Sequence, residues 1–531
     1  MTGQTGMEIP AAGSTVRTNG RPFWVALGLC SLVLAISIYW QQRWGTVADT
    51  SWLITVGERV LSGERLYVDL IEANPPFSVW MYMPAIAAAR LAGTAPEVLV
   101  HAYVYLICAL GLGFAALMAR RAGFAENAGL LALLPAFFAL LILFPGNAFT
   151  ERDHLGAALL APLLVLTAWR IAADAGEQPS RQIAVLAGLA GSIIALVKPY
   201  YVVAIIGPAL YLAWRKRSLR PLFGIEYWSA AAICLVYLGA ILLIHPTFVS
   251  EILPLLSETY LRMKLPFWML LQRYAAGYLL IFVLLKLIRP GLALSPLAAV
   301  FGLASLAAAV VLVYQAKGWP YHAYPAIALG LAALLCQTVR PPFLSIRELG
   351  GARALLLTGA VLVNAFPFMT TQKPGAELVA AIREASERPT MALIGSDIAA
   401  GHPLTRMVKG EWVSAYCSDW LGSFSLYLGA VAHKAGDPTA DRYEAIVSDY
   451  TASKLAEFQR TEPDIILVQK EDALWRGYFE SLDEYAELMI AYRQLSEDDT
   501  ITAYVRKESA GPFSAQEALR TRTEWRLARR P

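Results

Sequence analysis

The sequence predicts an all-α bundle of about eleven transmembrane helices, followed by a C-terminal extracytoplasmic α/β domain. Three observations support this. The chain of 531 residues is 57% hydrophobic and only 16% charged, whereas soluble domains carry about 25% charged residues. Long apolar runs recur along most of the chain, with basic residues in alternate connections. From about Met369 the composition changes to that of a soluble domain.

The N-terminal segment, residues 1–21, is predicted to be a disordered cytoplasmic tail because it is polar and rich in Gly and Thr. Arg17 and Arg21 precede the apolar run Phe23–Trp40, as at the start of a signal peptide. No convincing small-residue cleavage site follows. We therefore expect this run to be retained as the first helix of a transmembrane domain, residues 22–368.

The membrane spans are predicted from apolar length, since a spanning helix needs about 20 apolar residues and fewer when it is buried in a bundle. The candidate segments are 22–41, 97–119, 127–145, 153–170, 182–197, 200–214, 227–244, 275–289, 294–314, 323–339 and 352–368. With the N-terminus inside, nearly every inner connection is basic, as at Arg120–Arg121 and Arg215–Arg217. A further span at 77–92 would put these clusters outside, so that segment is expected to be interfacial or re-entrant.

An odd number of spans leaves residues 369–531 outside, where we expect the α/β domain. Met391–Ile394 and Ile465–Val468 resemble buried strands, and Ile501–Arg506 alternates as a strand does. Helices are expected at 376–386, 440–459 and 472–487. The expected location is the bacterial inner (plasma) membrane, with a cytoplasmic N-terminus and a periplasmic C-terminal domain.

Charge and cysteine usage exclude several classes of function. The net charge is only +3, and no basic tract suggests a nucleic-acid partner. The five cysteines show neither metal-ligand spacing nor a disulfide framework in the C-terminal domain. Membrane lipids are the expected surroundings of the bundle.

The first outer loop, residues 42–96, carries several carboxylates where charge is otherwise scarce. After Asp49, the apolar residues Trp52, Leu53 and Val56 recur at helical spacing, which predicts a short amphipathic helix at the membrane surface. Asp49 could act in catalysis or simply cap that helix. Glu72, before Asn74, is either a second acidic site or a solvated loop carboxylate.

The other outer connections also place ionisable residues at membrane level, where they are costly and usually retained for function. These residues, together with neighbouring aromatic side chains, are Glu151, Arg152, Asp153 and His154; Lys198, Tyr200 and Tyr201; Arg262 and Lys264; and Lys317, Trp319, Tyr321 and His322. Each group has a structural alternative. The acids could stabilise a helix N-terminus, the lysines could extend to the interface, and the aromatic residues could form an interfacial belt.

The order of these features resembles the GT-C superfamily of integral-membrane glycosyltransferases. The features are an acidic loop after the first helix with Asn74-Pro75-Pro76, Glu151–Leu155, Lys198-Pro199, and Gln315–Pro325. The resemblance covers about residues 22–370. It is closest to the branch of protein O-mannosyltransferases and the aminoarabinose transferase.

The resemblance implies a polyprenyl-phosphate sugar donor and gives each candidate residue a role. Asp49 would be the catalytic base, with Glu72, Glu151 and Asp153 as a second acidic or acceptor site. The donor phosphate would be bound by Arg152, Lys198, Lys317 and His322, and the substrate groove would be lined by Tyr200, Tyr201, Trp319 and Tyr321. Many relatives carry a second acid beside the first, but Thr50 follows Asp49 here. No cofactor is therefore predicted, and a divalent metal is possible but not indicated.

The predicted function is inverting transfer of a sugar from a polyprenyl-phosphate donor to an acceptor hydroxyl on the outer face. The acceptor could be an envelope glycan, lipid or protein. Two other readings are a transporter of lipid-linked sugar or polysaccharide and a non-catalytic subunit that binds lipid-linked sugar. Transport predicts charges near mid-membrane and internal symmetry, whereas the charges here lie at the outer ends of the spans.

Overall fold

The computed structural model describes residues 21–124, 127–173, 178–287, 293–338, 346–370 and 373–507. The predicted N-terminal tail, apart from Arg21, and the end of the chain after Lys507 lie outside the described residues.

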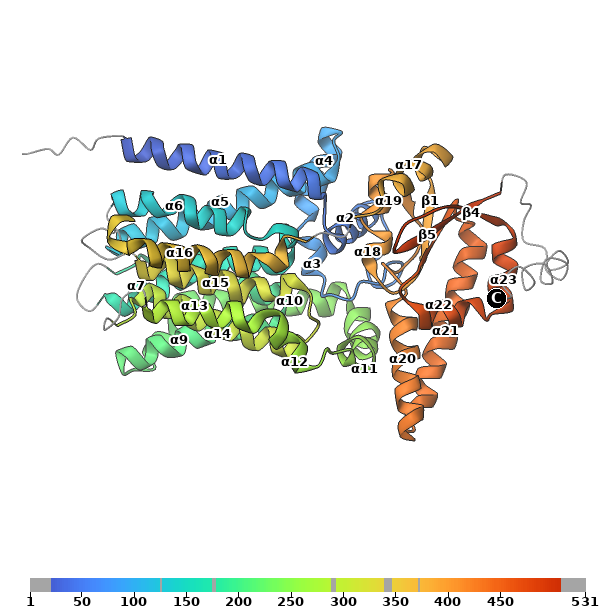
Figure 1. Cartoon of the computed structure of the whole chain (residues 1–531). Helices are drawn as coiled ribbons and strands as arrows, with labels where there is room; N and C mark the ends of the chain where they lie inside the picture. The colour runs from blue at the N-terminus through green and yellow to red at the C-terminus, as the bar shows by residue number, and fades with distance from the viewer. Residues whose placement is uncertain are drawn as a thin grey trace, which may run out of the picture.

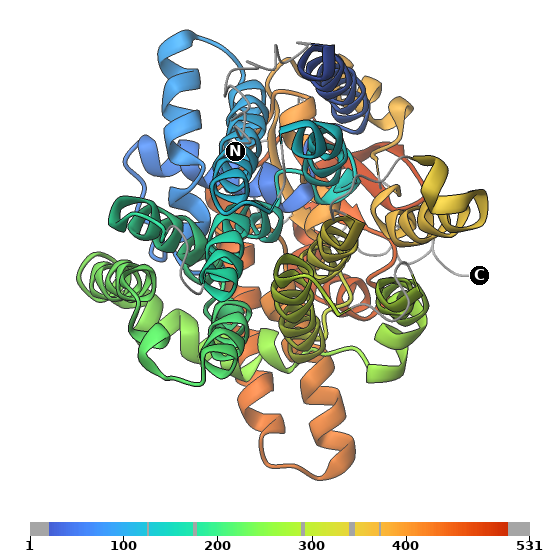
Figure 2. The same ribbon diagram turned by 90° about the vertical axis from the view of Figure 1, so that its left-hand side faces the viewer.

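The apolar segments form a bundle of long helices that lie side by side (Figure 1), which Figure 2 shows end-on. The helices at the predicted spans are α1 (Arg21–Trp44), α5 (Pro96–Arg121), α6 (Asn127–Ile142), α7 (Arg152–Ala172), α8 (Arg181–Val197), α9 (Val203–Lys216), α10 (Ile225–Ile244), α13 (Ala276–Leu287), α14 (Pro296–Gln315), α15 (Pro320–Thr338) and α16 (Ile346–Ala365). Within the described residues, 6 helices are long and apolar enough to cross a membrane, and the shorter apolar helices lie beside them. The chain is an integral membrane protein.

Helix α7 lies at the centre of the bundle and is buried along most of its length. Small residues allow its neighbours to approach closely, as is common between membrane helices. A Cβ at Gly156 would lie 2.9 Å from Ile194 of α8, and one at Gly111 of α5 would lie 3.1 Å from the Ala158 carbonyl oxygen. This packing fixes the N-terminal end of α7, where the candidate residues begin.

The first outer loop forms α2 (Ala48–Leu61), α3 (Phe77–Trp80) and α4 (Met83–Ala92) at the end of the bundle that faces the C-terminal domain (Figure 1). Helix α2 is buried on all sides from Thr50 to Gly57, rather than on one apolar face only. With only 10 residues, α4 is too short to cross a bilayer, which agrees with the interfacial reading of 77–92. Two more short helices, α11 (Leu253–Glu258) and α12 (Phe267–Leu270), lie between α10 and α13.

The C-terminal domain is a five-stranded sheet of order β2-β1-β3-β5-β4. Its strands are β1 (Thr390–Ile394), β2 (Glu411–Trp412), β3 (Ile465–Gln469), β4 (Tyr492–Glu497) and β5 (Ile501–Arg506). Strand β1 is parallel to β2 and β3, whereas β5 is antiparallel to β3 and β4. The helices are α17 (Ala376–Ala385), α18 (Ile398–Gly401), α19 (Leu404–Met407), α20 (Trp420–Ala435), α21 (Ala440–Thr461), α22 (Ala473–Glu480) and α23 (Asp483–Ile490).

Three strands and two helices of this domain lie where the sequence predicts them. The single helix expected at 472–487 is instead α22 and α23, which are separated at Ser481 and Leu482. The short edge strand β2, the apolar helix α20 and the polar strand β4 were not predicted. Neither a two-residue strand nor YRQLSE has a clear apolar alternation.

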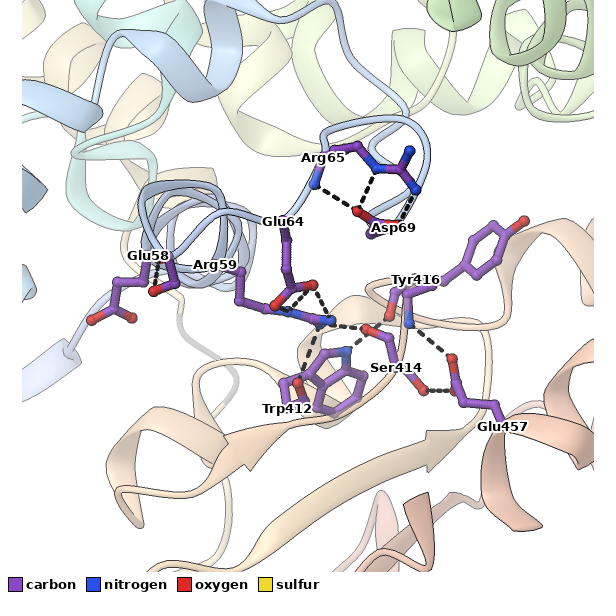
Figure 3. Close-up of polar contacts among 11 residues, drawn as sticks. Glu58, Arg59, Glu64, Arg65, Asp69, Trp412, Ser414, Tyr416 and Glu457 are labelled. Atoms are coloured by element: carbon purple, nitrogen blue, oxygen red, sulfur yellow. Dashed lines mark hydrogen bonds and ion pairs between the residues drawn. The ribbon is translucent and has the colours of Figure 1, made fainter. Parts of the chain in front are cut away.

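The C-terminal domain is joined to the first outer loop by several polar contacts. The Ile71 amide donates to the Ala415 carbonyl at 2.9 Å. The Arg59 guanidinium donates to the Ser414 carbonyl at 2.8 Å and pairs with Glu64 (Figure 3). The guanidinium of Arg406 in α19 pairs with Glu97 at 2.5 Å and also with Glu58. These contacts hold α2, and therefore Asp49, against the outer domain.

Candidate functional site

The site begins with an ion pair between the first turns of two helices. Asp49 lies in the first turn of α2, and Arg152 lies in the first turn of α7. Their side chains pair at 3.5 Å, with Asp49 26% and Arg152 2% exposed. Asp49 does not cap its own helix, because Val47 is the N-cap residue and no side-chain cap bond is made there. A carboxylate that solvent can reach therefore lies beside a buried cation.

The segment before α7 is held in a strained conformation that brings the two helices together. Thr150 has φ +74, a value that is unfavourable for a β-branched residue. Its hydroxyl donates to the Thr50 hydroxyl at 3.1 Å, and its carbonyl accepts from the Tyr82 hydroxyl at 2.6 Å. Strain of this kind persists where surrounding contacts over-determine the backbone, often at functional sites.

Next to Arg152, Asp153 joins α7 to the connection between α8 and α9. Its Oδ2 accepts from Lys198 Nζ at 2.7 Å, and its Oδ1 accepts from the Tyr201 hydroxyl at 2.7 Å. Gln315, at the end of α14, accepts from Lys198 at 3.3 Å and from the Tyr200 hydroxyl at 3.0 Å. Lys198 and Tyr201 are buried, so they are neither a snorkelling lysine nor an interfacial belt residue. Both oxygens of Asp153 are already used.

Several buried polar atoms around the ion pair have no partner among the described residues. They are Nε and Nη1 of Arg152, Oε2 of Glu151, Nε2 of Gln315, Nδ1 of His322 and Oγ of Ser51. Buried polar groups are nearly always hydrogen-bonded, so unpaired ones need a water or a ligand. Most of these free atoms are donors or can be donors. The site is therefore equipped to receive an acceptor-rich group such as a phosphate.

A second cation lies on the side of the site nearest the C-terminal domain. Lys317 Nζ lies 4.0 Å from the centre of the Tyr260 ring and donates to the Met263 carbonyl at 2.6 Å. Burial, with a contribution from nearby Lys264, lowers the pKa of Lys317 to about 8. The Tyr260 ring also packs against Trp319 at 6.2 Å and against Trp420 of α20 at 5.7 Å.

The remaining predicted aromatic and histidine residues lie together. The Tyr321 ring is 5.2 Å from Lys198 Nζ, 5.8 Å from the Trp319 ring and 4.5 Å from the His322 ring. Tyr321 and His322 are buried, whereas Trp319 is 38% exposed. The predicted groove residues thus belong to one neighbourhood with the predicted cations.

Glu72 is buried rather than solvated, and it organises the loop. It accepts from the Trp52 indole at 2.5 Å and from the Asn74 backbone amide at 2.8 Å. Burial raises the pKa of Glu72, while the nearby Arg152 charge opposes this rise. Burial also raises the pKa of Glu151 well above its usual range, and the charge of Asp49 adds to the effect. Asp49 therefore differs from both glutamates in being accessible to solvent.

The bundle also contains an apolar cavity of about 100 Å³ between α5, α6, α7, α14 and α15. It is lined by leucine, alanine and phenylalanine side chains and by Tyr324, whose ring is 5.2 Å from the His154 ring. His154 directly follows Asp153, so the cavity approaches the polar site from the bundle side. Its apolar lining suits a hydrocarbon chain. Over the described ranges, no group of three or more His, Cys, Asp or Glu is placed to hold a metal ion.

Sequence reasoning missed Gln315, Tyr260 and Trp420. Gln315 was detectable as a polar residue at the end of an apolar run, directly before Ala316-Lys317. Tyr260 and Trp420 gave no such signal, because a single aromatic residue in an apolar stretch is ordinarily a packing residue. The partners that join them come from segments far apart in the chain.

Comparison of structures identifies known proteins with a similar fold, whereas comparison of sequences identifies no family. No protein-family model matches the chain, and no curated protein does either. The chain is similar to the crystal structure of ArnT from Cupriavidus metallidurans bound to undecaprenyl phosphate, with a TM-score of 0.55 and 14% identity. The match covers 92% of this chain and 99% of that one. The apo structure of the same protein gives a TM-score of 0.53 and 15% identity, over 92% and 100% of the two chains.

These matches confirm the predicted fold class, a polytopic helical bundle with a C-terminal α/β domain. The number of helices that cross the membrane stays a prediction. The chain is an integral membrane protein with the fold of ArnT, as its resemblance to GT-C glycosyltransferases predicted.

Proposed function

We propose that the protein is an inverting glycosyltransferase that moves a sugar from a polyprenyl-phosphate donor to an acceptor hydroxyl. One observation carries this proposal. The solvent-accessible carboxylate of Asp49 lies 3.5 Å from Arg152, and the buried guanidinium has two nitrogens, Nε and Nη1, without partners. A base and a cation with unpaired N–H groups are therefore adjacent, as transfer from a phosphate leaving group requires.

The reaction follows from these two groups. As the acceptor oxygen attacks the anomeric carbon, its proton passes to the Asp49 carboxylate. The bond between the anomeric carbon and the phosphate oxygen breaks, and its electron pair leaves with the polyprenyl phosphate. Because the acceptor attacks the face opposite the phosphate, the configuration inverts in one step and a single base is enough. The departing phosphate needs positive charge more than a proton donor.

Arg152 and the N-terminal end of α7 would bind the donor phosphate, since helix N-termini and guanidinium groups both favour phosphate. Lys317, beside the Tyr260 ring, would add a second positive charge. Lys198 would contribute its charge through Asp153 rather than by direct contact, because its ammonium is already paired at 2.7 Å. His322 Nδ1 and Gln315 Nε2 are further groups available to the donor.

The donor's lipid would extend from this site into the apolar cavity of the bundle. The fold neighbour was crystallised with undecaprenyl phosphate, which supports a ligand of this class here. Glu72 and Asp153 would keep the loop and Lys198 in place, and the raised pKa of Glu151, caused by burial, would lessen its repulsion toward the phosphate. No step of this scheme requires a metal ion. The protein would lie in the bacterial inner membrane with its C-terminal domain in the periplasm.

Binding of undecaprenyl phosphate to the purified protein in lipid nanodiscs tests the donor site. Loss of hydrogen bonds to a charged group is expected to weaken binding about 10- to 100-fold in Arg152→Gln. Arg43→Gln, which changes an exposed arginine at the end of α1, is the matched control and should bind as wild type. A thermal unfolding curve establishes that Arg152→Gln remains folded. Equal binding by the two folded variants would contradict the assignment of Arg152.

A further inference from the structure

The edge of the C-terminal sheet that faces the membrane domain has the form of a ligand site. Strands β1, β2 and β3 are parallel, so their carboxyl ends meet at one edge, where α/β sheets usually bind ligands. The loop after β2 contains Ala415, which accepts from the Ile71 amide of the first outer loop at 2.9 Å. This edge therefore faces the first outer loop, whose helix α2 lies between the bundle and the sheet in Figure 1.

A buried network fixes the loops at this edge. Asp419 accepts from Lys454 Nζ at 2.8 Å, from the Tyr450 hydroxyl at 2.7 Å and from the Gly395 amide at 2.9 Å. Glu457 accepts from the Ser414 hydroxyl and from the Ala415 amide (Figure 3). These carboxylates already have protein partners. Their role is to hold the loops after β1 and β2 in place.

Two side chains at the same edge retain capacity for a ligand. The Trp420 side chain is buried, and its indole Nε1 has no partner among the described residues. Asp397 Oδ1 accepts from the Ala399 amide at 2.9 Å, and no described residue donates to its Oδ2. One group is thus a free donor and the other a free acceptor.

Both side chains are close to the proposed reaction centre. The Trp420 ring packs at 5.7 Å on Tyr260, and that tyrosine ring lies beneath the Lys317 ammonium. Burial raises the pKa of Asp397, and the charge of Asp49 contributes to the rise. Asp397 therefore lies within electrostatic range of the proposed base. The loop that carries Asp397 and the helix that carries Asp49 are also in contact, since α18 packs against α2.

We propose that this edge binds the acceptor and that the acceptor is a carbohydrate, whose hydroxyls donate to Asp397 and accept from the Trp420 indole. The inference rests on the proposed glycosyltransfer. A sugar offers several hydroxyls that both donate and accept, together with apolar faces that pack on aromatic rings such as Tyr260 and Trp319. A serine or threonine of a peptide offers only one hydroxyl, which Asp49 itself would engage.

The test uses binding rather than turnover. Full-length protein in nanodiscs is titrated with a panel of neutral tetrasaccharides, and bound sugar is detected by saturation-transfer NMR. We expect affinity to fall about 10- to 100-fold in Asp397→Asn and about 2- to 10-fold in Trp420→Phe, as for lost charged and neutral hydrogen bonds. Asp441→Asn and Trp214→Phe change exposed residues of the same types and should bind as wild type.

Undecaprenyl phosphate binding separates this inference from the proposed function. If the two edge variants bind undecaprenyl phosphate normally but lose sugar binding, the acceptor site is supported. If they bind sugar as tightly as the controls, or if no member of the panel binds, the inference is overturned while the donor site stands. Binding of a serine- and threonine-containing peptide, with no binding by any sugar, would also overturn it in favour of a protein acceptor.

Discussion

Asp49→Asn separates the catalytic role of this residue from its structural one. Asparagine has nearly the same shape, and residue 49 makes no side-chain cap bond in α2, so the helix should be unaffected. The change removes the negative charge from the 3.5 Å pair with Arg152 and leaves no group able to take the acceptor proton. General base catalysis contributes about 100- to 10,000-fold to a rate, and we expect the sugar-transfer step to slow by that factor.

Donor binding should respond differently from the rate. Arg152 keeps its charge in Asp49→Asn and loses a competitor for the phosphate, so the donor Kd should stay the same or decrease. The assay is single-turnover transfer from an undecaprenyl-phosphate sugar in nanodiscs, because product release can hide the chemical step in steady-state rates. Asp69→Asn is the matched control. It lies in the same loop but forms an exposed pair with Arg65, which contributes little to stability.

A single-turnover rate of Asp49→Asn within about threefold of that of Asp69→Asn would refute the reasoning. Such a rate would mean that the substitution removes no transition-state interaction. Weaker donor binding by Asp49→Asn would also conflict with it, because the base is not assigned to the phosphate site.

Three further predictions follow from the cations of the site and of the domain interface. Burial lowers the pKa of Lys317 to about 8, so its charge is present below that pH and lost above it. Undecaprenyl phosphate affinity should fall as the pH rises from about 7 to 9, and Lys317→Arg, charged throughout, should abolish that fall in a titration. Arg406→Ala leaves Glu58 and Glu97 without their shared cation. Because these acids are 31% and 25% exposed, we expect a loss of about 1–3 kcal/mol, less than for a fully buried pair, measured by denaturant unfolding against Asp441→Asn. Arg152→Lys keeps the charge but not the fork of N–H groups. It should bind donor within about 10-fold of wild type yet lose a larger factor in the transfer rate. An equal loss in both would contradict a role of the guanidinium in placing the phosphate relative to Asp49.

The bundle and much of the outer domain were predictable because each depends on local pattern. Apolar length located the helices, and the basic connections predicted that 77–92 does not cross the membrane, which agrees with the 10 residues of α4. The pattern failed where tertiary contacts decide structure. Strand β2 has 2 residues and exists only because Glu411 and Trp412 pair with β1. Helix α20 was overlooked because its apolar sequence does not distinguish a helix from a buried β-strand.

The candidate residues were found in the sequence, but their pairing was not. Arg152 was expected to bind phosphate and Asp49 to act alone, whereas the two form one unit across α2 and α7. Lys198 and Asp153 were assigned to different substrates, yet they are bonded to each other at 2.7 Å. Charge type and membrane depth can be read from one sequence, because both are local properties. Which acid meets which base depends on how the helices pack, and that information is distributed over the whole bundle.

Because Arg152 pairs with Asp49, we interpret it as more than a group that binds the phosphate. It would also set the distance between the base and the phosphate leaving group. Its Nη2 is the atom that approaches Asp49, while Nε and Nη1 are free. A planar guanidinium that bonded the phosphate through Nη1 while its Nη2 faces Asp49 would fix the position of the leaving group relative to the base. Inversion requires that the acceptor and the phosphate lie on opposite sides of the anomeric carbon, so this separation must be constant. The strained turn at Thr150 and the close packing of α7 on its neighbours keep Arg152 in place, which explains why a polar site is built on a helix that is buried along most of its length.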